Sequence, residues 1–257
     1  MRVKTLIQSV DRAIEILEIV RDADGPVRAA MIAHEMELPL KTAHNLIRSL
    51  LQHGYLVQNE EKSYQLGPEC FLLADQAKGP FSQLGRQVGD AVLELHRKSG
   101  MAAFFGCDYA YRLYCVTIVE ASGYREINGR QLWLNSMHAT AAGRVILAAR
   151  GEAYLERFLE QSELRKFNPQ TKNMPEQLRA EVEKTRRDGF SVVEDEHVVG
   201  FISVAIPVTT PQGKLLGGLA SSCRTHFWHE RKLQLEEVLR DLRWSAGRII
   251  EAHGNLL

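Results

Sequence analysis

Six polar side chains between residues 41 and 62 have the types and spacing that recognise DNA. Lysine and arginine bind phosphates or guanine, and the asparagine amide can form a bidentate pair with adenine. The sequence from 40 to 53 contains no aspartate or glutamate, so this stretch offers donors without an acidic group. The six candidates for contact with DNA are Lys41, Thr42, His44, Asn45, Arg48 and Lys62.

The first five of these residues lie on a segment with helical periodicity. Apolar residues from Leu40 to His53 recur every three or four positions, which places them on one helix face and the polar residues opposite. A short helical segment from Val27, a turn at Pro39 and a hairpin over 55–66 flank this helix, which is the order of a winged helix-turn-helix. A polar helix face alone would equally indicate simple solvation, and the flanking elements favour DNA contact.

The neighbouring segments carry three further expectations. The alternation of Tyr55, Val57, Tyr64 and Leu66 predicts a hairpin that buries these residues. The turn before the polar helix lacks the glycine that is common in such turns, and Glu37 occupies it with some strain. In the opening helix we expect a buried apolar stripe made of Val10, Ala13, Ile14, Leu17 and Val20.

The charge balance gives no support to DNA binding. The whole chain of 257 residues has a formal net charge of +0. Counting residues 1–67 gives eight Lys and Arg against nine Asp and Glu, a net of −1. Attraction to phosphate must therefore come from where the cations are placed, and two or more copies acting together are expected to share the binding.

Composition indicates an ordinary cytoplasmic protein. Apolar residues make up 45% of the chain, and no run of about eighteen of them predicts a membrane span. The N-terminal segment meets acidic residues too early for a signal peptide. The four cysteines lack CxxC spacing and are interpreted as reduced thiols.

Residues 81–257 alternate between helical and strand patterns. Strands are predicted in the middle, including one over 124–134, with helices at both ends, and a single long helix is expected from about 228 to 253. This arrangement predicts an α+β fold. We divide the chain into a DNA-binding domain over 1–67, a linker helix over 68–80 and a second domain over 81–257.

Other reactive groups in the second domain have simpler interpretations. Cys223, His226 and His229 have a ligand-like spacing but lack a clear fourth ligand, so no metal is expected. No nucleophile motif accompanies His138, which we expect to bond backbone groups beside a pocket rather than act as a base. The adjacent acids Glu194, Asp195 and Glu196 are expected to face water. No phosphate-binding loop is present, and no cofactor is expected.

Six segments in order resemble the IclR (isocitrate-lyase-regulator) family of bacterial transcription factors. They are SVDRAIEILEIV, LPLKTAHNLIRSLLQHGYLVQ, YQLGP, MHATAAGRVILA, RRDGFSVVEDE and GFISVAIPV, and they span nearly the whole chain. The resemblance implies a winged helix-turn-helix, a linker helix and a GAF-like effector domain. It also implies operator DNA and a small organic effector as partners, a homodimer or dimer of dimers, and no enzymatic activity.

The resemblance further implies an effector pocket in the second domain. The matching positions are Ala141, Ala142, Val193, Ser203, Ala220 and Ser222, with Trp133 brought close by a longer preceding segment. Members that bind small keto acids carry Asp, Cys and Ser where this chain has Val193, Ser203 and Ala220. We therefore expect an effector larger or more apolar than glyoxylate or pyruvate, including aromatic compounds.

A second class of function stays open on the sequence. Winged helices also bind proteins, so the chain could be a small-molecule sensor or enzyme with a protein-interaction domain. The neutral net charge is compatible with this alternative. DNA binding that weakens steeply with salt would favour the transcription regulator over the sensor or enzyme.

Overall fold

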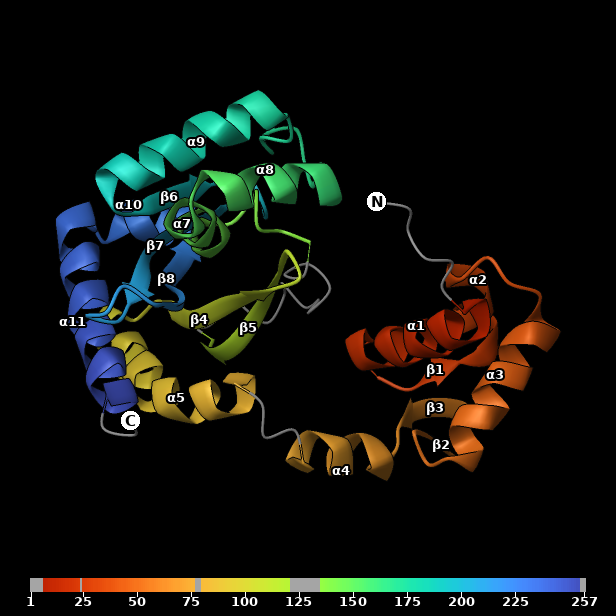
Figure 1. Cartoon of the computed structure of the whole chain (residues 1–257). Coiled ribbons are helices and arrows are strands. Elements are labelled where there is room, and N and C mark those ends of the chain that lie inside the picture. The colour runs from red at the N-terminus through yellow and green to blue at the C-terminus, as the bar shows by residue number, and fades with distance from the viewer. Residues whose placement is uncertain (1–6, 24, 77–79, 121–134, 255–257) are drawn as a thin grey trace. The chain divides into compact units, whose positions relative to one another are not determined.

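The computed structural model describes residues 7–23, 25–76, 80–120 and 135–254, which form two compact units, Met1–Lys78 and Gly79–Leu257 (Figure 1). The strand predicted over 124–134 lies outside the described residues. No helix in the described ranges is long and apolar enough to cross a membrane.

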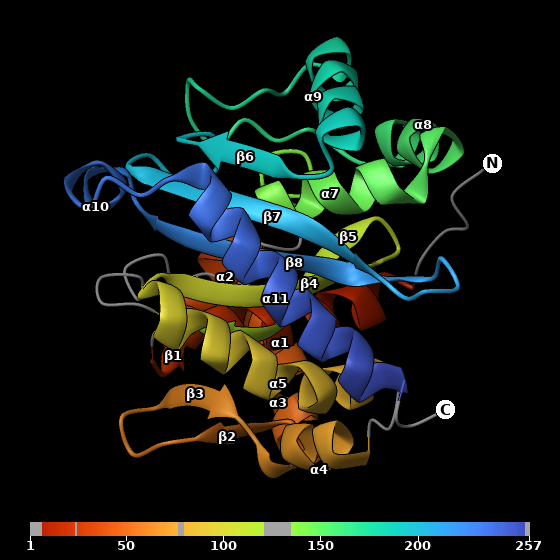
Figure 2. The ribbon, with the colours of Figure 1, turned by 90° about the vertical axis from the view of Figure 1, so that its left-hand side faces the viewer.

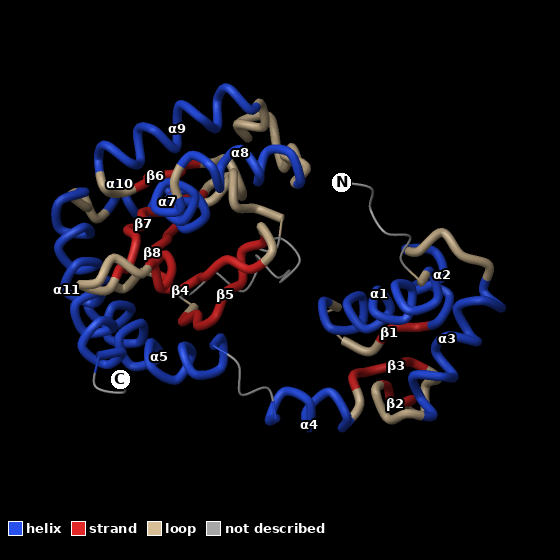
Figure 3. Tube along the Cα trace, viewed as in Figure 1, coloured by secondary structure: helices blue, strands red, loops and turns tan. Residues whose placement is uncertain are grey.

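The first unit combines four helices with a small antiparallel sheet (Figure 3). The sheet order is β1-β3-β2, and β1 is a short strand that was not predicted. The helix predicted from Val27 begins two residues later, at Ala29, because Val27 and Arg28 form β1. In chain order the elements are α1 (Gln8–Asp22), β1 (Val27–Arg28), α2 (Ala29–Glu35), α3 (Leu40–Gln52), β2 (Leu56–Gln58), β3 (Ser63–Leu66) and α4 (Pro68–Gln76).

The core of this unit corrects two predicted faces. In α1 the buried residues are Ile16, Ile19 and Val20, whereas Val10 and Ile14 are half exposed. In the wing, Leu56 is buried and Val57 is 41% exposed, so the expected inward face of β2 was wrong by one residue. A shift by one position reverses the face of a strand, and a three-residue strand gives little pattern to fix it.

The turn between α2 and α3 confirms the strain expected at Glu37. Its φ is 51°, in the left-handed region that non-glycine residues rarely adopt. The next residue, Leu38, donates its N–H to the Ala33 carbonyl at 2.9 Å, which closes the turn. Such a conformation costs about 1 kcal/mol or more, offset here by the packing of the two helices.

The second unit is built on a five-stranded antiparallel sheet. The strand order is β5-β4-β8-β7-β6, so the first hairpin pairs with the last strand in the chain. The strands are β4 (Ala102–Tyr109), β5 (Arg112–Val119), β6 (Ser191–Glu194), β7 (Phe201–Thr209) and β8 (Leu215–Arg224).

Helices cover both faces of this sheet (Figure 2). One face packs against α5 (Pro80–Ser99) and α11 (Leu235–Gly254). The other face packs against α7 (Ala141–Arg150), which is itself covered by α8 (Glu152–Gln161) and α9 (Pro175–Asp188). Gly218 lets α7 approach β8, because an added Cβ would lie 2.9 Å from the Ala142 carbonyl oxygen.

The single C-terminal helix predicted from about 228 is two helices. α10 (Thr225–Glu230) ends at Arg231, and α11 begins only at Leu235. Between them Lys232 has a φ of 48°, a conformation that interrupts a helix. The structure has the predicted α+β class, with a helix-turn-helix unit followed by a unit of mixed sheet and helices.

Candidate DNA-reading surface and effector cleft

Helix α3 separates an apolar face from a polar one, as predicted. Ala43, Ile47 and Leu50 are buried in the core of the first unit. On the other side, all but one of the predicted contact residues of α3 are exposed, and Thr42 is half-buried. The exposed ones are Lys41, His44, Asn45 and Arg48. The structure therefore brings four donor-bearing side chains together on one solvent-facing surface.

Two of these side chains are already joined. The Arg48 guanidinium donates to Oδ1 of Asn45 at 2.7 Å, one helical turn away. This contact uses one Arg48 donor and the Asn45 carbonyl oxygen, and it does not involve the Asn45 amide N–H groups. The pair can therefore act as one reading unit for a base edge and a neighbouring phosphate.

Lys62 lies apart from α3, at the tip of the wing. Its φ is 59°, and the tip is tied by the Asn59 side chain, whose Oδ1 accepts from the N–H groups of Glu61 and Ser63 at 3.1 and 2.9 Å. Lys62 is exposed, and so are the adjacent acids Glu60 and Glu61. Their charges weaken the attraction of this tip for phosphate, so Lys62 is the weakest of the six candidates.

A cleft opens in the second unit between the sheet and the start of α7. Its floor is a row of residues across the sheet, since Val193 is the register partner of Ser203 and Ser203 is the partner of Ser222. The residues that line it are Phe104, Ala139, Thr140, Val193, Asp195, Glu196, His197, Val198, Phe201, Ser203 and Ser222.

Three of the seven predicted effector residues line this cleft: Val193, Ser203 and Ser222. Ala141, Ala142 and Ala220 do not, because their side chains are fully buried in the core beneath it. Trp133 lies outside the described residues. Ala141 and Ala142 nevertheless belong to the first turn of α7, where amide N–H groups have no acceptor within the helix.

The two serines on the floor have assigned donor and acceptor roles. Ser222 donates its hydroxyl hydrogen to the Ile202 carbonyl at 3.0 Å, so the Ser203 hydroxyl is the donor in the 2.8 Å contact with Ser222. Both hydroxyl hydrogens thus form hydrogen bonds within the protein. The serine oxygens can only accept hydrogen bonds from a ligand. Phe104, Phe201 and Val193 supply the apolar walls around them.

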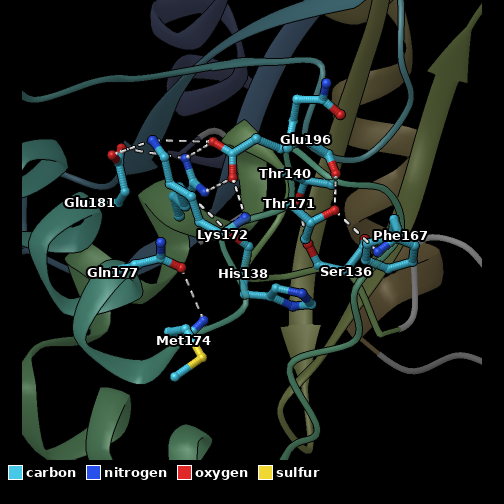
Figure 4. Close-up of polar contacts among 12 residues, drawn as sticks. Ser136, His138, Thr140, Phe167, Thr171, Lys172, Met174, Gln177, Glu181 and Glu196 are labelled. Carbon is cyan, nitrogen blue, oxygen red and sulfur yellow. Dashed lines mark hydrogen bonds and ion pairs between the residues drawn. The ribbon is translucent and has the colours of Figure 1, made fainter.

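Sequence reasoning missed a buried charge cluster beside the cleft (Figure 4). Arg144 is fully buried and donates two hydrogen bonds to Glu196, at 2.9 and 2.6 Å. Glu181 accepts a further bond from Arg144 and pairs with Lys172. Glu196 is therefore buried and paired, and the expectation that it faces water was wrong; its neighbour Glu194 is exposed.

The start of α7 is fixed by its cap and by close packing. The Thr140 hydroxyl accepts from the Gly143 N–H at 3.2 Å and donates to the Ser136 carbonyl at 3.0 Å. A Cβ at Gly143 would lie 2.2 Å from the Met137 carbonyl oxygen, so only glycine fits there. These contacts hold the first turn of α7 against the cleft.

His138 bonds the backbone, as predicted. Its Nε2 lies 2.9 Å from the Arg165 carbonyl oxygen, which requires a proton on Nε2. Nδ1 is buried and has no hydrogen-bond partner among the described residues. Burial lowers the pKa of His138 below its ordinary value of 6.5, so the ring is neutral.

No group of three His, Cys, Asp or Glu side chains that could hold a metal ion occurs in the described part of the chain. Cys223 is buried, and burial raises the pKa of its thiol to about 12. A thiol with that pKa is protonated at neutral pH and is a poor metal ligand.

Comparison with known proteins identifies the two parts of the chain. Residues 9–60 match the family described as the IclR helix-turn-helix domain, and residues 83–250 match the bacterial transcriptional regulator IclR C-terminal domain. The chain belongs to the IclR family. It is a DNA-binding transcriptional regulator whose second domain is the effector-binding domain of the IclR type.

Curated relatives in the IclR comparison are named as regulators. The HTH-type transcriptional regulator XynR of Escherichia coli K12 is 31% identical, over 86% of this chain and 87% of XynR. The Pca regulon regulatory protein of Pseudomonas putida is 25% identical, over 93% of this chain and 81% of that protein. These names do not favour the alternative of a sensor or enzyme with a protein-interaction domain.

Solved IclR structures share the fold. An IclR homologue from Microbacterium hydrocarbonoxydans, crystallised with 4-hydroxybenzoate, has a TM-score of 0.77 at 18% identity, covering 95% of this chain and 98% of the homologue. An IclR regulator from Alicyclobacillus acidocaldarius has a TM-score of 0.75 at 20% identity, covering 96% of this chain and 99% of the regulator.

Proposed function

We propose that this IclR-family chain reads operator DNA through Lys41, Thr42, His44, Asn45 and Arg48 of α3, with Lys62 as a minor phosphate contact. The observation that carries the proposal is the polar face of α3, which is exposed, rich in donors and free of carboxylates. Asn45 and Arg48 are assigned to base edges, and Lys41 to phosphate.

The cleft above Val193, Ser203 and Ser222 is the proposed effector site. It combines aromatic and aliphatic walls with lone pairs on two serine oxygens, so it suits a ligand with an apolar body and a hydroxyl donor. An anionic group at one end of the ligand would accept hydrogen bonds from the main-chain N–H groups of Ala141 and Ala142, in the first turn of α7. The Microbacterium hydrocarbonoxydans homologue was crystallised with 4-hydroxybenzoate, which has this chemistry, and supports an effector larger or more apolar than glyoxylate or pyruvate.

A homodimer or dimer of dimers is the proposed assembly. Ile7, Val10 and Ile14 follow one helical face of the first unit and are 70%, 52% and 50% exposed. Apolar residues with this spacing suit pairing with the same helix of a second copy. Two copies would place two α3 helices on one operator, which compensates for the low charge of each.

Effector binding is proposed to change operator affinity without any catalysed reaction. The linker helix, α4, joins the two units and is the proposed route by which the cleft alters the spacing of paired reading helices. The coupling must be reciprocal, so operator DNA changes effector affinity by the same factor. A regulator of this kind works in the cytoplasm, where the operator lies.

The proposal is tested in two steps. In vitro selection from random duplexes identifies the operator, and a thermal-shift panel compares 4-hydroxybenzoate, benzoate, pyruvate and glyoxylate. We expect 4-hydroxybenzoate to raise the melting temperature more than pyruvate or glyoxylate does. A shift with only the small keto acids would rule out the proposed effector class.

A further inference from the structure

We propose that Glu196 is a positioning residue that fixes one wall of the effector cleft. Glu196 belongs to the segment 195–198, and all four residues of this segment line the cleft. The inference rests on the proposed effector site and adds to it the group that holds the wall in place. The contacts of Glu196 carry it (Figure 4).

The carboxylate of Glu196 ties the wall to two other elements. Arg144 of α7 binds both carboxylate oxygens, and the main-chain N–H of Lys172 donates to Oε2 at 3.1 Å. The ammonium group of Lys172 lies 3.4 Å from Oε1 and also pairs with Glu181 of α9. One carboxylate therefore joins the wall to α7, to the segment before α9 and, through Lys172, to α9.

The carbonyl of Glu196 is held as well. The Thr171 hydroxyl donates to it at 2.6 Å, and the Asn168 side-chain amide donates at 3.0 Å. Both donors come from the segment that supplies Lys172. The segment 168–172 thus binds both the main chain and the side chain of Glu196, and Arg144 of α7 binds the side chain as well.

Other contacts also restrain the wall. Asp195 has a φ of 59°, which is unfavourable for a residue with a side chain, and its carboxylate accepts from the Gly200 N–H to keep the turn closed. Val199 is 59% exposed, whereas Val198 packs against the core cluster that contains the apolar residues of α7. The His197 ring also contacts the Phe167 ring, with 4.8 Å between the centroids. The hydrogen bonds between Arg144 and Glu196 are the directional polar link between this turn and α7, beside the apolar contact of Val198.

A buried ion pair is weak evidence for stability, because the loss of solvation offsets most of the attraction. Its placement here points to a role in shape. Arg144 and Glu196 are directional partners whose bidentate geometry sets the distance between the wall and the start of α7. That distance defines the width of the cleft between Thr140 and the wall.

Hydrogen exchange on the full-length protein without ligand tests this role. Thr171→Val removes the hydroxyl donor to Glu196, whereas Thr171→Ser retains it and is the matched control. We expect amides in the peptide 195–200 to exchange at least tenfold faster in Thr171→Val, with the peptide 238–246 of α11 unchanged. Glu196→Gln, which keeps the size of the side chain but removes the charge that pairs with Arg144 and Lys172, should accelerate the same peptide.

Two results would overturn the proposal. Unchanged exchange in 195–200 in both Thr171→Val and Glu196→Gln would show that Glu196 does not hold the wall. Equal acceleration in 238–246 would show general destabilisation instead. A calorimetric titration with 4-hydroxybenzoate adds a binding readout, expected to weaken at least fivefold in Thr171→Val and less than twofold in Thr171→Ser. If 4-hydroxybenzoate binds none of these proteins, the proposed effector class fails, while the exchange result still decides the role of Glu196.

Discussion

Asn45 and Arg48 are joined by a 2.7 Å hydrogen bond across one turn of α3. The bond orients the asparagine amide and restricts the rotamers of the arginine. Ordering these side chains in advance lowers the conformational entropy lost on binding. The two residues should therefore contribute to operator binding as a unit.

A double-mutant cycle tests that unit. We expect Asn45→Ala to weaken operator binding by about 1–3 kcal/mol and to relax preference at one base pair, as for loss of a bidentate contact. Arg48→Ala should have a similar cost, and the double variant should lose less than the sum. Fluorescence anisotropy on the selected operator measures all four affinities.

Gln52→Ala is the control for this cycle. Gln52 is exposed at the C-terminal end of α3, away from the cluster of donors, and its replacement should leave affinity unchanged. Strictly additive losses for Asn45 and Arg48 would mean that they contact DNA independently.

The serine pair on the cleft floor should determine preference for a hydroxyl group. Ser203→Ala removes an acceptor that faces the ligand, so affinity for 4-hydroxybenzoate should fall about fivefold, the value of one neutral hydrogen bond. Affinity for benzoate should be unchanged. Calorimetry with both compounds checks this, and an equal loss for both would indicate a general change in cleft shape.

Breaking the buried ion pair should destabilise the second unit strongly. Arg144→Met leaves Glu196 with a buried, poorly compensated charge, which is expected to cost about 3–5 kcal/mol. Adding Glu196→Met in the same chain should recover much of that loss. The chain's three tryptophans, Trp133, Trp228 and Trp244, all lie beyond residue 80, so tryptophan fluorescence in urea reports the second unit.

Arg179→Met is the matched control for that experiment. Arg179 and Glu156 form a salt bridge of similar geometry at 2.8 Å, but both side chains are exposed. Solvent screens such a pair, so its loss should change the urea midpoint little. Equal effects at Arg144 and Arg179 would contradict the importance of burial.

His138 should make the second unit less stable in acid. Because burial lowers the pKa of His138 in the folded protein, the folded chain binds this proton at a lower pH than the unfolded chain, which binds it near pH 6.5. Stability should therefore fall as pH drops below that value, by at most about 1.4 kcal/mol per pH unit. His138→Gln keeps the donor to Arg165 and should flatten this dependence in urea titrations from pH 7.5 to 5.5.

Exposed His226→Gln is the comparison for His138, and it should retain the wild-type pH dependence. If both variants behaved like the wild type, another group would be responsible for any loss of stability in acid.

The sequence predicted elements with strong periodicity better than it predicted contacts. The residues of α3 that were expected to be buried or exposed are largely so, because thirteen residues repeat the pattern several times. The three-residue strand β2 has almost no pattern, and its inward face was predicted wrongly.

The cleft depends on long-range pairing that spacing cannot reveal. Glu196 was assigned to solvent because it follows two other acids, yet its partner Arg144 lies 52 positions earlier. One signal was present: Arg144 interrupts the apolar run AAGRVILAA, and a cation at a buried helix position requires a buried acid. The resemblance assigned Ala141, Ala142 and Ala220 to the effector pocket, but their side chains lie in the core. A matching family position does not specify whether the side chain or the main chain of a residue faces a ligand.

The salt dependence of operator binding tests the central claim most directly. Anisotropy of the selected duplex should show affinity falling linearly with salt on logarithmic axes, and Lys41→Ala should reduce that slope by about one unit. Failure of selection to enrich any duplex, or affinity that does not change with salt, would contradict a DNA-reading role for α3.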